Sequence, residues 1–357
     1  MFVRTLSLAA VAAGLLVVPA ACGSFDASAD PDADGGGASV DGGATEGAPI
    51  SDGSVPDAAR PAEGSAPGQV KVLASGYSQL RGIVATETDV YFIDQTTGGV
   101  HRVAIDGTSM PVDLVMGRGP SSLALADGQL FWTNLPTMSV ESVAITGGAV
   151  VTSPPSAADH LASMIAASGA LVFALVPGEN DGGANGEIRQ YASATLSPIS
   201  GTISPLVNPF ALAASGTSIY WTEGGPSSAV ASAIAGSSMR KLLFTEDDAE
   251  LIAADGAGIY WTVPSMGLVR ASIGGAPAIT IASGEDHPAG LASDGTYVYW
   301  QTSNNQLRRT GHIAGGTSSS FAEGFVALTE MHTSSIAVTS TYVVWLTGDG
   351  QVLRKLR

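Results

Sequence analysis

Three of the five histidines in this chain stand at one spacing from a following aromatic residue. An interval of thirteen positions separates the members of each pair, His160–Phe173, His287–Trp300 and His332–Trp345. Imidazole nitrogens bind divalent metal ions or act as general bases, and adjacent carboxylates can orient them. Asp159 and Asp286 directly precede two of these histidines. If the spacing brings the histidines to one rim, they would form a metal or ligand site able to support lyase or hydrolase chemistry.

The same interval leads back from four other aromatic residues to further occupants of this position. They are Gln79, Gly119, Asn208 and Asp248. We include Asn208 among the candidate site residues, together with Arg81, which follows the position in the first repeat. The alternative is a wet rim of polar residues that does no chemistry. No catalytic motif such as HExxH or GxSxG occurs, so the catalytic residues are unknown.

The elements that would position these residues are repeated seven times. One aromatic strand recurs as DVYFID (89–94), QLFWTN (129–134), ALVFAL (170–175), SIYWTE (218–223), GIYWTV (258–263), YVYWQT (297–302) and YVVWLT (342–347). The aromatic anchors follow one another at intervals of 39 to 48 residues. A period near 40 is typical of the four-stranded blade of a β-propeller.

Each repeat has the same internal order. A strand of small residues comes first, and a turn such as Asp127-Gly128 leads to the aromatic strand; two further strands complete the unit. Small side chains suit the crowded axis of a propeller, and bulky aromatic side chains suit the space between blades. The sequence therefore predicts an all-β, seven-bladed propeller over residues 69–357, with six blades as the alternative. The last repeat lacks a fourth strand, which the segment 69–75 (QVKVLAS) would supply.

The phrases GIYWT, SIYWT and DHPAGLASDGTYVYW resemble the repeats of bacterial NHL-type and YWTD-type propellers. The resemblance implies the propeller fold, which hosts lyases, lactonases, dehydrogenases and binding scaffolds. It also implies that channel histidines serve catalysis in certain lyases of this type. The Tyr-Trp-Thr-Asp tetrad is never complete here, because Thr222-Glu223, Thr262-Val263 and Gln301-Thr302 follow the Tyr-Trp pairs.

The composition excludes several classes of protein. A single Cys allows neither a disulfide framework nor a cysteine-rich zinc module. The net charge of -17 leaves no basic surface of the kind that binds nucleic acid, so we expect no nucleic-acid partner. We expect a monomer. His101 and His312 lie in the predicted third strands, where we expect exposed side chains.

Residues 1–22 have the pattern of an export signal. Arg4 precedes an apolar stretch that is short for a membrane-spanning helix, and Ala20 and Ala21 precede Cys22. The segment resembles a bacterial lipoprotein signal, which implies lipidation of Cys22 and a membrane as a partner. Gly23 follows the Cys and favours delivery to the outer membrane, facing the periplasm or the cell surface. The alternative is ordinary cleavage after Ala21.

Residues 23–68 are rich in Gly, Ala and Asp and carry a net charge of -8. They contain too few apolar residues to form a core, so we expect a disordered acidic tether. The whole chain is then a lipid-anchored propeller that acts as a binding or scaffold module for a protein, a peptide or a small ligand. The alternative function is a metal-assisted lyase or hydrolase that uses the histidine-lined site. No cofactor is certain, and a divalent metal is the one that this site would take.

Overall fold

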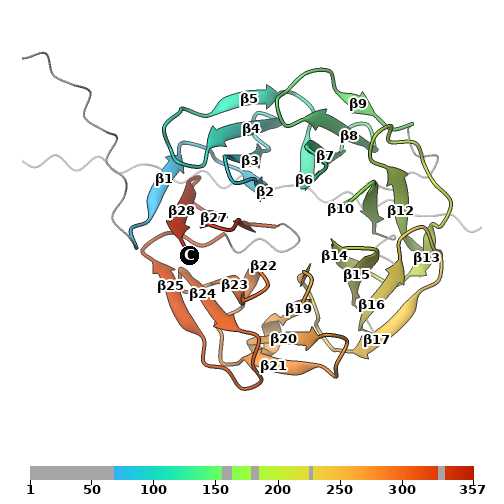
Figure 1. Cartoon of the computed structure of the whole chain (residues 1–357), viewed down its shortest axis with the longest axis vertical. Helices are drawn as coiled ribbons and strands as arrows, with labels where there is room; N and C mark the ends of the chain where they lie inside the picture. The colour runs from blue at the N-terminus through green and yellow to red at the C-terminus, as the bar shows by residue number, and fades with distance from the viewer. Residues whose placement is uncertain (1–67, 155–162, 178–184, 225–227, 329–333) are drawn as a thin grey trace, which may run out of the picture. The chain divides into compact units, whose positions relative to one another are not determined.

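A computed structural model describes residues 68–154, 163–177, 185–224, 228–328 and 334–357. The described residues form seven four-stranded antiparallel sheets, arranged as blades in a ring (Figure 1). The predicted seven-bladed propeller is thereby confirmed and the six-bladed alternative is wrong. The signal peptide, Cys22 and the tether up to residue 67 lie outside the described residues.

The first four blades follow one another along the chain, each with its innermost strand first. Blade 1 contains β2 (Leu80–Ala85), β3 (Asp89–Asp94), β4 (Gly99–Ala104) and β5 (Val112–Val115). Blade 2 contains β6 (Pro120–Ala126), β7 (Gln129–Asn134), β8 (Ser139–Ala144) and β9 (Val151–Thr152). Blade 3 contains β10 (Met164–Ser168), β11 (Leu171–Val176), β12 (Gly186–Ala192) and β13 (Ile203–Leu206). Blade 4 contains β14 (Pro209–Ser215), β15 (Ser218–Glu223), β16 (Ala229–Ile234) and β17 (Lys241–Thr245).

The remaining blades complete the ring. Blade 5 contains β18 (Ile252–Ala254), β19 (Gly258–Val263), β20 (Leu268–Ile273) and β21 (Ile279–Ala282), with the short 3-10 helix η1 (Pro264–Met266) after its second strand. Blade 6 contains β22 (Ala289–Ser293), β23 (Tyr297–Thr302), β24 (Gln306–Gly311) and β25 (Ser319–Glu323). Blade 7 contains β26 (Ile336–Val338), β27 (Tyr342–Leu346), β28 (Val352–Leu356) and, outermost, β1 (Lys71–Ala74).

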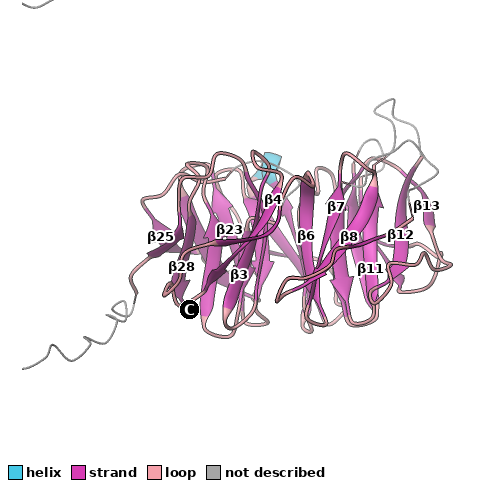
Figure 2. Ribbon diagram, turned by 90° about the horizontal axis from the view of Figure 1, so that it is seen from above, coloured by secondary structure: helices cyan, strands magenta, loops and turns pink. Residues whose placement is uncertain are grey.

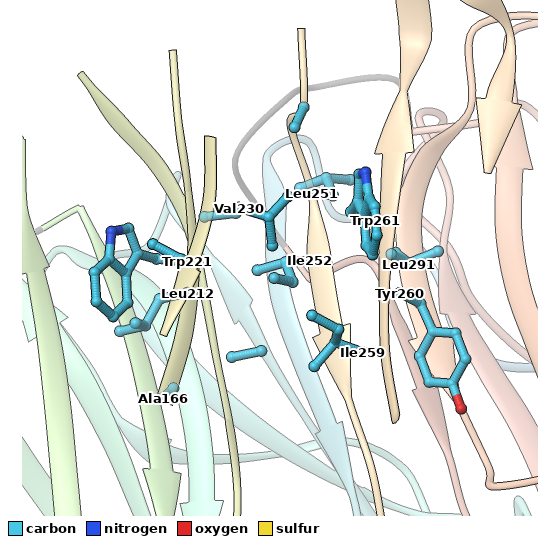
Figure 3. Close-up of a cluster of buried hydrophobic side chains, with 14 of the residues drawn as sticks. Ala166, Leu212, Trp221, Val230, Leu251, Ile252, Ile259, Tyr260, Trp261 and Leu291 are labelled. Carbon is cyan, nitrogen blue, oxygen red and sulfur yellow. The ribbon is translucent and has the colours of Figure 1, made fainter. Parts of the chain in front are cut away.

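The aromatic strands pack between blades, as their sequence pattern predicts. All five Trp side chains are fully buried, and Trp261 of blade 5 stacks on Phe244 of blade 4 with ring centroids 5.3 Å apart. Tyr260 and Trp261 are successive residues of β19 and project to opposite sides of the blade (Figure 3). Both faces of a blade are therefore apolar, which explains why the strands read as continuous apolar runs.

The strands of small residues surround the axis of the ring. Their side chains line a central channel with a volume of about 380 Å³. Neighbouring inner strands approach closely here, since the Ile83 amide of β2 donates a 3.0 Å hydrogen bond to the Ser334 carbonyl beside β26. Gly82 has a φ of +55°, and a Cβ on it would lie 3.2 Å from the Leu123 nitrogen of the next blade. Only glycine fits this bulge without strain.

Strand β1 closes the ring. It pairs antiparallel with β28, with Lys71 opposite Arg354 and Val72 opposite Leu353. The Lys71 amine also donates a 2.8 Å hydrogen bond to the Asp106 carbonyl of blade 1. The segment 69–75 therefore supplies the fourth strand of the last blade, as the sequence predicts.

The ring has two distinct faces. The mouth face carries the connections from the outermost strand of one blade to the innermost strand of the next, such as residues 283–288, and also carries η1. The opposite face carries the hairpin turns between first and second strands and the end of β28. Figure 2 shows η1 at one edge of the ring and the end of β28 at the other. None of the helices in the described residues is long and apolar enough to cross a bilayer.

Candidate functional site

The repeat position that contains the histidines lies where the connection from the preceding blade reaches the innermost strand, and we call it the joint. Its occupant has a left-handed conformation in four blades, with φ values of 57° at Gly119, 42° at Asn208, 61° at Asp248 and 49° at His287. In two of these blades the main-chain carbonyl accepts a hydrogen bond from the connection after the second strand, from Leu135 to Gly119 and from Gly224 to Asn208. In these two blades the joint thus fixes the incoming connection to its own blade.

This conformation explains the residue types at the position. Among residues other than glycine, Asn, Asp and His are several-fold enriched at positive φ. The recurrence of Gly, Asn, Asp and His thirteen residues before the anchor therefore follows from backbone geometry and needs no shared ligand. In these blades the repeated residue types therefore reflect the local backbone conformation and do not indicate a shared site.

The structure places four of the seven predicted rim residues. His287 and Asp286 are exposed on the mouth face, and the Asp286 carbonyl accepts a 2.9 Å hydrogen bond from the Ser303 amide. Asn208 and Arg81 are half-buried, in blades 4 and 1. His160, His332 and Asp159 lie outside the described residues, so the convergence of three histidines stays a prediction.

The channel itself is unsuited to acid–base or metal chemistry. Its described lining consists of Val, Leu, Ile, Ala and Met side chains with a few serines, and contains no Asp, Glu, His, Lys or Arg. Within the described ranges no group of three or more His, Cys, Asp or Glu side chains is placed to hold a metal ion. The described residues therefore offer no charged side chain inside the channel.

One cluster of titratable side chains lies at this rim, and the sequence places two of its members, Asp248 and His287, at the repeat position but does not predict the third, Glu250. Glu250 directly precedes Leu251, the first channel-lining residue of blade 5, and its carboxyl group is half-buried. Burial raises the pKa of Glu250 above its ordinary value, the charge of Asp248 raises it further, and His287 of blade 6 lowers it. Glu250, Asp248 and His287, which we call the mouth cluster, thus interact across two blades. The sequence signal was a glutamate at the start of a strand of small apolar residues.

Asp248 has a structural contact as well. Its carboxylate accepts a 2.9 Å hydrogen bond from the Ser265 amide of η1. This contact replaces the main-chain hydrogen bond made at the joint in other blades. The side chain is exposed, so the carboxylate keeps solvent-facing acceptor capacity at the mouth.

Other charged rim residues are used by the fold. In blade 6, the Trp300 indole donates a 3.0 Å hydrogen bond to Glu285, and Arg308 forms a 2.8 Å ion pair with the same carboxylate. Glu285 is buried, so this group braces the incoming connection against the third strand. Removing one member of such a buried pair typically costs about 3–5 kcal/mol.

Blade 2 contains the same brace with its charges exchanged. Arg118 is in the connection and Glu141 is on the third strand, at 3.0 Å, and Trp132 donates a 2.9 Å hydrogen bond to Glu141. Arg118 and Glu285, the charged members of these two connections, are therefore structural. Their carboxylate and guanidinium groups already have partners.

The expectation of an exposed His101 was wrong. Its ring is 3% exposed and stacks on Phe92 at 5.2 Å, and its Nδ1 atom lies 2.8 Å from the Asp113 carboxylate. Residues directly opposite each other in an antiparallel pair share one face of the sheet, and His101 is opposite the anchor Phe92. His312 is half-buried and lies 3.3 Å from the Tyr260 hydroxyl, so it is not fully exposed either.

Comparison with known proteins identifies the fold. No family model and no curated protein sequence matches the chain. Similar solved structures include a streptogramin B lyase, with a TM-score of 0.64 and 11% identity over 81% of this chain and 98% of that one. A catalytically inactive histidine-to-alanine variant of virginiamycin B lyase from Staphylococcus aureus, with quinupristin, gives a TM-score of 0.58 and 10% identity over 80% and 98%. The WD40 propeller domain of Doa1 gives 0.59 and 11% over 80% and 96%. These likenesses establish a β-propeller.

The left-handed joint can be tested by substitution at His287. We expect His287→Asn to keep wild-type stability, whereas His287→Val should lose about 1–2 kcal/mol because a β-branched residue is strained at positive φ. Urea unfolding monitored by Trp fluorescence measures the difference. Asp286→Val is the control, since the adjacent exposed Asp286 has no positive φ. Equal losses in the two valine variants would contradict the role of the backbone.

The raised pKa of Glu250 predicts a pH dependence with a definite sign. The folded chain holds the Glu250 proton more tightly than the unfolded chain, so stability falls as pH rises from the ordinary glutamate range through the raised pKa. Glu250→Gln should match the wild type in acid and exceed its stability at neutral pH, as measured by thermal unfolding across pH. Glu87→Gln should show the opposite sign, because the Ser340 amide lowers the pKa of Glu87. A stability difference for Glu250→Gln that is independent of pH would contradict the assignment.

Proposed function

We propose that this propeller is a binding module whose ligand contacts the mouth cluster, Glu250, Asp248 and His287, above an apolar channel. The observation that carries the proposal is the half-buried Glu250 carboxyl with its raised pKa, which faces charged groups from two blades. Above that pKa the carboxylate lowers the stability of the fold. A group kept in such an environment is a candidate for function.

The chemistry of the cluster favours a ligand that carries a positive charge beside an apolar body. Burial and the negative charge of Asp248 both disfavour the ionised form of Glu250. A protonated amine beside the Glu250 carboxylate would supply a compensating positive charge. The apolar body would lie over the channel, whose lining offers aliphatic surface and serine hydroxyls. Binding would then deprotonate Glu250, so the affinity should rise with pH until the ligand amine itself loses its proton.

A second candidate is a metal-assisted lyase or hydrolase that uses His160, His287 and His332. Two similar structures are streptogramin-type lyases, and replacing one histidine inactivates such an enzyme. The residue phrases of the sequence add a likeness to NHL-type and YWTD-type repeats. At identities near 11% these likenesses support the fold and leave catalysis to experiment.

We further propose that the propeller acts outside the cytoplasm, attached to the outer membrane through a lipid on Cys22. The support is the order of Arg4, the apolar stretch and Cys22, followed by an acidic segment. A tether of this kind would let the mouth face meet ligands away from the bilayer.

The binding proposal is tested by a thermal-shift screen of apolar amines against the full chain. We expect stabilisation by at least one amine, stronger at pH 8 than at pH 5 and lost in Glu250→Gln. Asp127→Asn is the matched control, because Asp127 is an exposed carboxylate with positive φ in a hairpin turn of the opposite face. Binding that survives Glu250→Gln would place the ligand elsewhere. Stoichiometric zinc that is lost in a folded His160→Ala, His287→Ala, His332→Ala variant would instead favour the enzyme.

Mass spectrometry of the protein recovered from membranes tests the anchor. We expect a mature N-terminus at Cys22 with added acyl mass, and release of the protein into the soluble fraction when Cys22 is replaced by Ser. An N-terminus at Cys22 without acyl mass would show that the segment is cleaved as an ordinary export signal.

A further inference from the structure

The arginines of the ring are, in general, neutralised by carboxylates. Between described residues, seven of them form ion pairs, with the partners Arg102–Asp89, Arg118–Glu141, Arg189–Glu187, Arg240–Glu223, Arg270–Glu246, Arg308–Glu285 and Arg357–Asp294. This pairing is expected in a chain with 32 acidic and 15 basic residues. A place where cations gather without carboxylates is therefore informative.

Such a place lies between blades 6 and 7, on the face opposite the mouth. A pocket of about 580 Å³ is bordered there by the start of β25, the turn after β26 and the end of β28. Among the described residues, its lining contains the three cations Arg309, Lys355 and Arg357 and no Asp or Glu side chain. We call these three residues with the pocket around them the basic pocket.

Two of the cations are unneutralised and held in place. Within the described part of the chain, no carboxylate lies at ion-pair distance from Arg309 or Lys355. The Arg309 guanidinium lies 4.7 Å from the centroid of Tyr297 and 5.0 Å from that of Phe321. The Lys355 amine lies 4.8 Å from the Phe321 centroid and donates a hydrogen bond to the Phe321 carbonyl. Cation–π contacts orient both groups, and Arg309 also interacts with the Tyr299 hydroxyl. A guanidinium has five N–H donors and an ammonium three, so each group has more donors than these contacts use.

The third cation is partly neutralised. Arg357 forms a 2.7 Å ion pair with Asp294 and donates hydrogen bonds to the Thr339 and Ser340 carbonyls. The Asp294 carboxylate also accepts a 2.9 Å hydrogen bond from the Tyr299 hydroxyl. Asp294 is not part of the pocket lining.

Glu87 also borders the rim, where its carboxylate accepts a 2.7 Å hydrogen bond from the Ser340 amide. Arg309 and Lys355 are the lining cations that have no carboxylate partner among the described residues. The Ser320 hydroxyl adds a neutral donor at the rim of the pocket. The Ser340 and Thr341 side chains also lie there and interact with the Glu87 carboxylate.

We propose that the basic pocket binds a phosphate group. Arg309 and Lys355, which have no carboxylate partner among the described residues, can pair with the negative charges of a phosphate monoester, and guanidinium, ammonium and hydroxyl donors match its oxygens. The phosphate could belong to a soluble phosphate ester or to the headgroup of an anionic phospholipid. This site shares no residue with the mouth cluster, so either proposal can fail without the other.

The test begins with free phosphate. Isothermal titration of the full chain with inorganic phosphate and with glycerol phosphate should show one site whose affinity falls as salt rises. Arg309→Gln and Lys355→Gln should each weaken binding by about tenfold or more, because each removes a charged hydrogen-bond donor. Lys241→Gln is the matched control, since it removes an exposed lysine from a different pocket. Phosphate affinity that is unchanged in a folded Arg309→Gln, Lys355→Gln double variant overturns the proposal.

A second variant covers the case in which the double variant does not fold. Thr341 is exposed at the rim, and Thr341→Glu adds a carboxylate there without altering either cation. It should abolish phosphate binding while leaving the melting temperature near that of the wild type. Unchanged binding in Thr341→Glu also overturns the proposal.

Vesicles distinguish the two sources of phosphate. A full chain with Cys22→Ser, which cannot be acylated, is sedimented with phosphatidylglycerol-containing vesicles or with phosphatidylcholine vesicles alone. Binding only to the anionic vesicles, reversed by glycerol phosphate and lost in Arg309→Gln, identifies the headgroup. Phosphate binding in solution without vesicle binding identifies a soluble ester. The absence of both overturns the proposal.

Discussion

Closure of the ring by β1 is the constraint on which the other features depend. A blade of this protein buries both faces, so each blade needs a neighbour on either side, and an open array would expose two apolar faces. The pairing of β1 with β28 completes the last blade, and Lys71 connects it to blade 1. The buried Trp side chains, the narrow apolar channel and the fixed order of loops on each face all follow from this closed geometry.

Within the closed ring, most charged residues near the mouth serve the fold. Trp300, Glu285 and Arg308 form one brace, and the charge-exchanged brace in blade 2 has the same position. Because these carboxylates and guanidinium groups are paired, they are not available to a ligand. The residues at the left-handed joint also serve the fold, since Gly, Asn, Asp and His are the residues that most readily adopt its positive φ.

The groups that remain are unevenly distributed between the two faces. The mouth face keeps the acidic mouth cluster around Glu250, whereas the opposite face keeps Arg309 and Lys355 in the basic pocket. Opposite charges on opposite faces suit ligands of opposite sign. In a chain anchored beside a membrane, such an arrangement would also favour one orientation over the other.

The sequence by itself determined the repeated unit, the order of its strands and the closing segment, and the structure decided between seven blades and six. These depend on signals that recur every 40 residues or so, such as the aromatic anchors ending at Trp345, and on burial that any such repeat requires. The tertiary structure alone decided which polar residues do structural work. Contacts between loops and strands far apart in the chain pair Glu285 with Arg308, bury His101 and bring the charge of His287 to bear on Glu250. Spacing within a repeat predicts which residues share a position, but the charge balance there is set by neighbours in space.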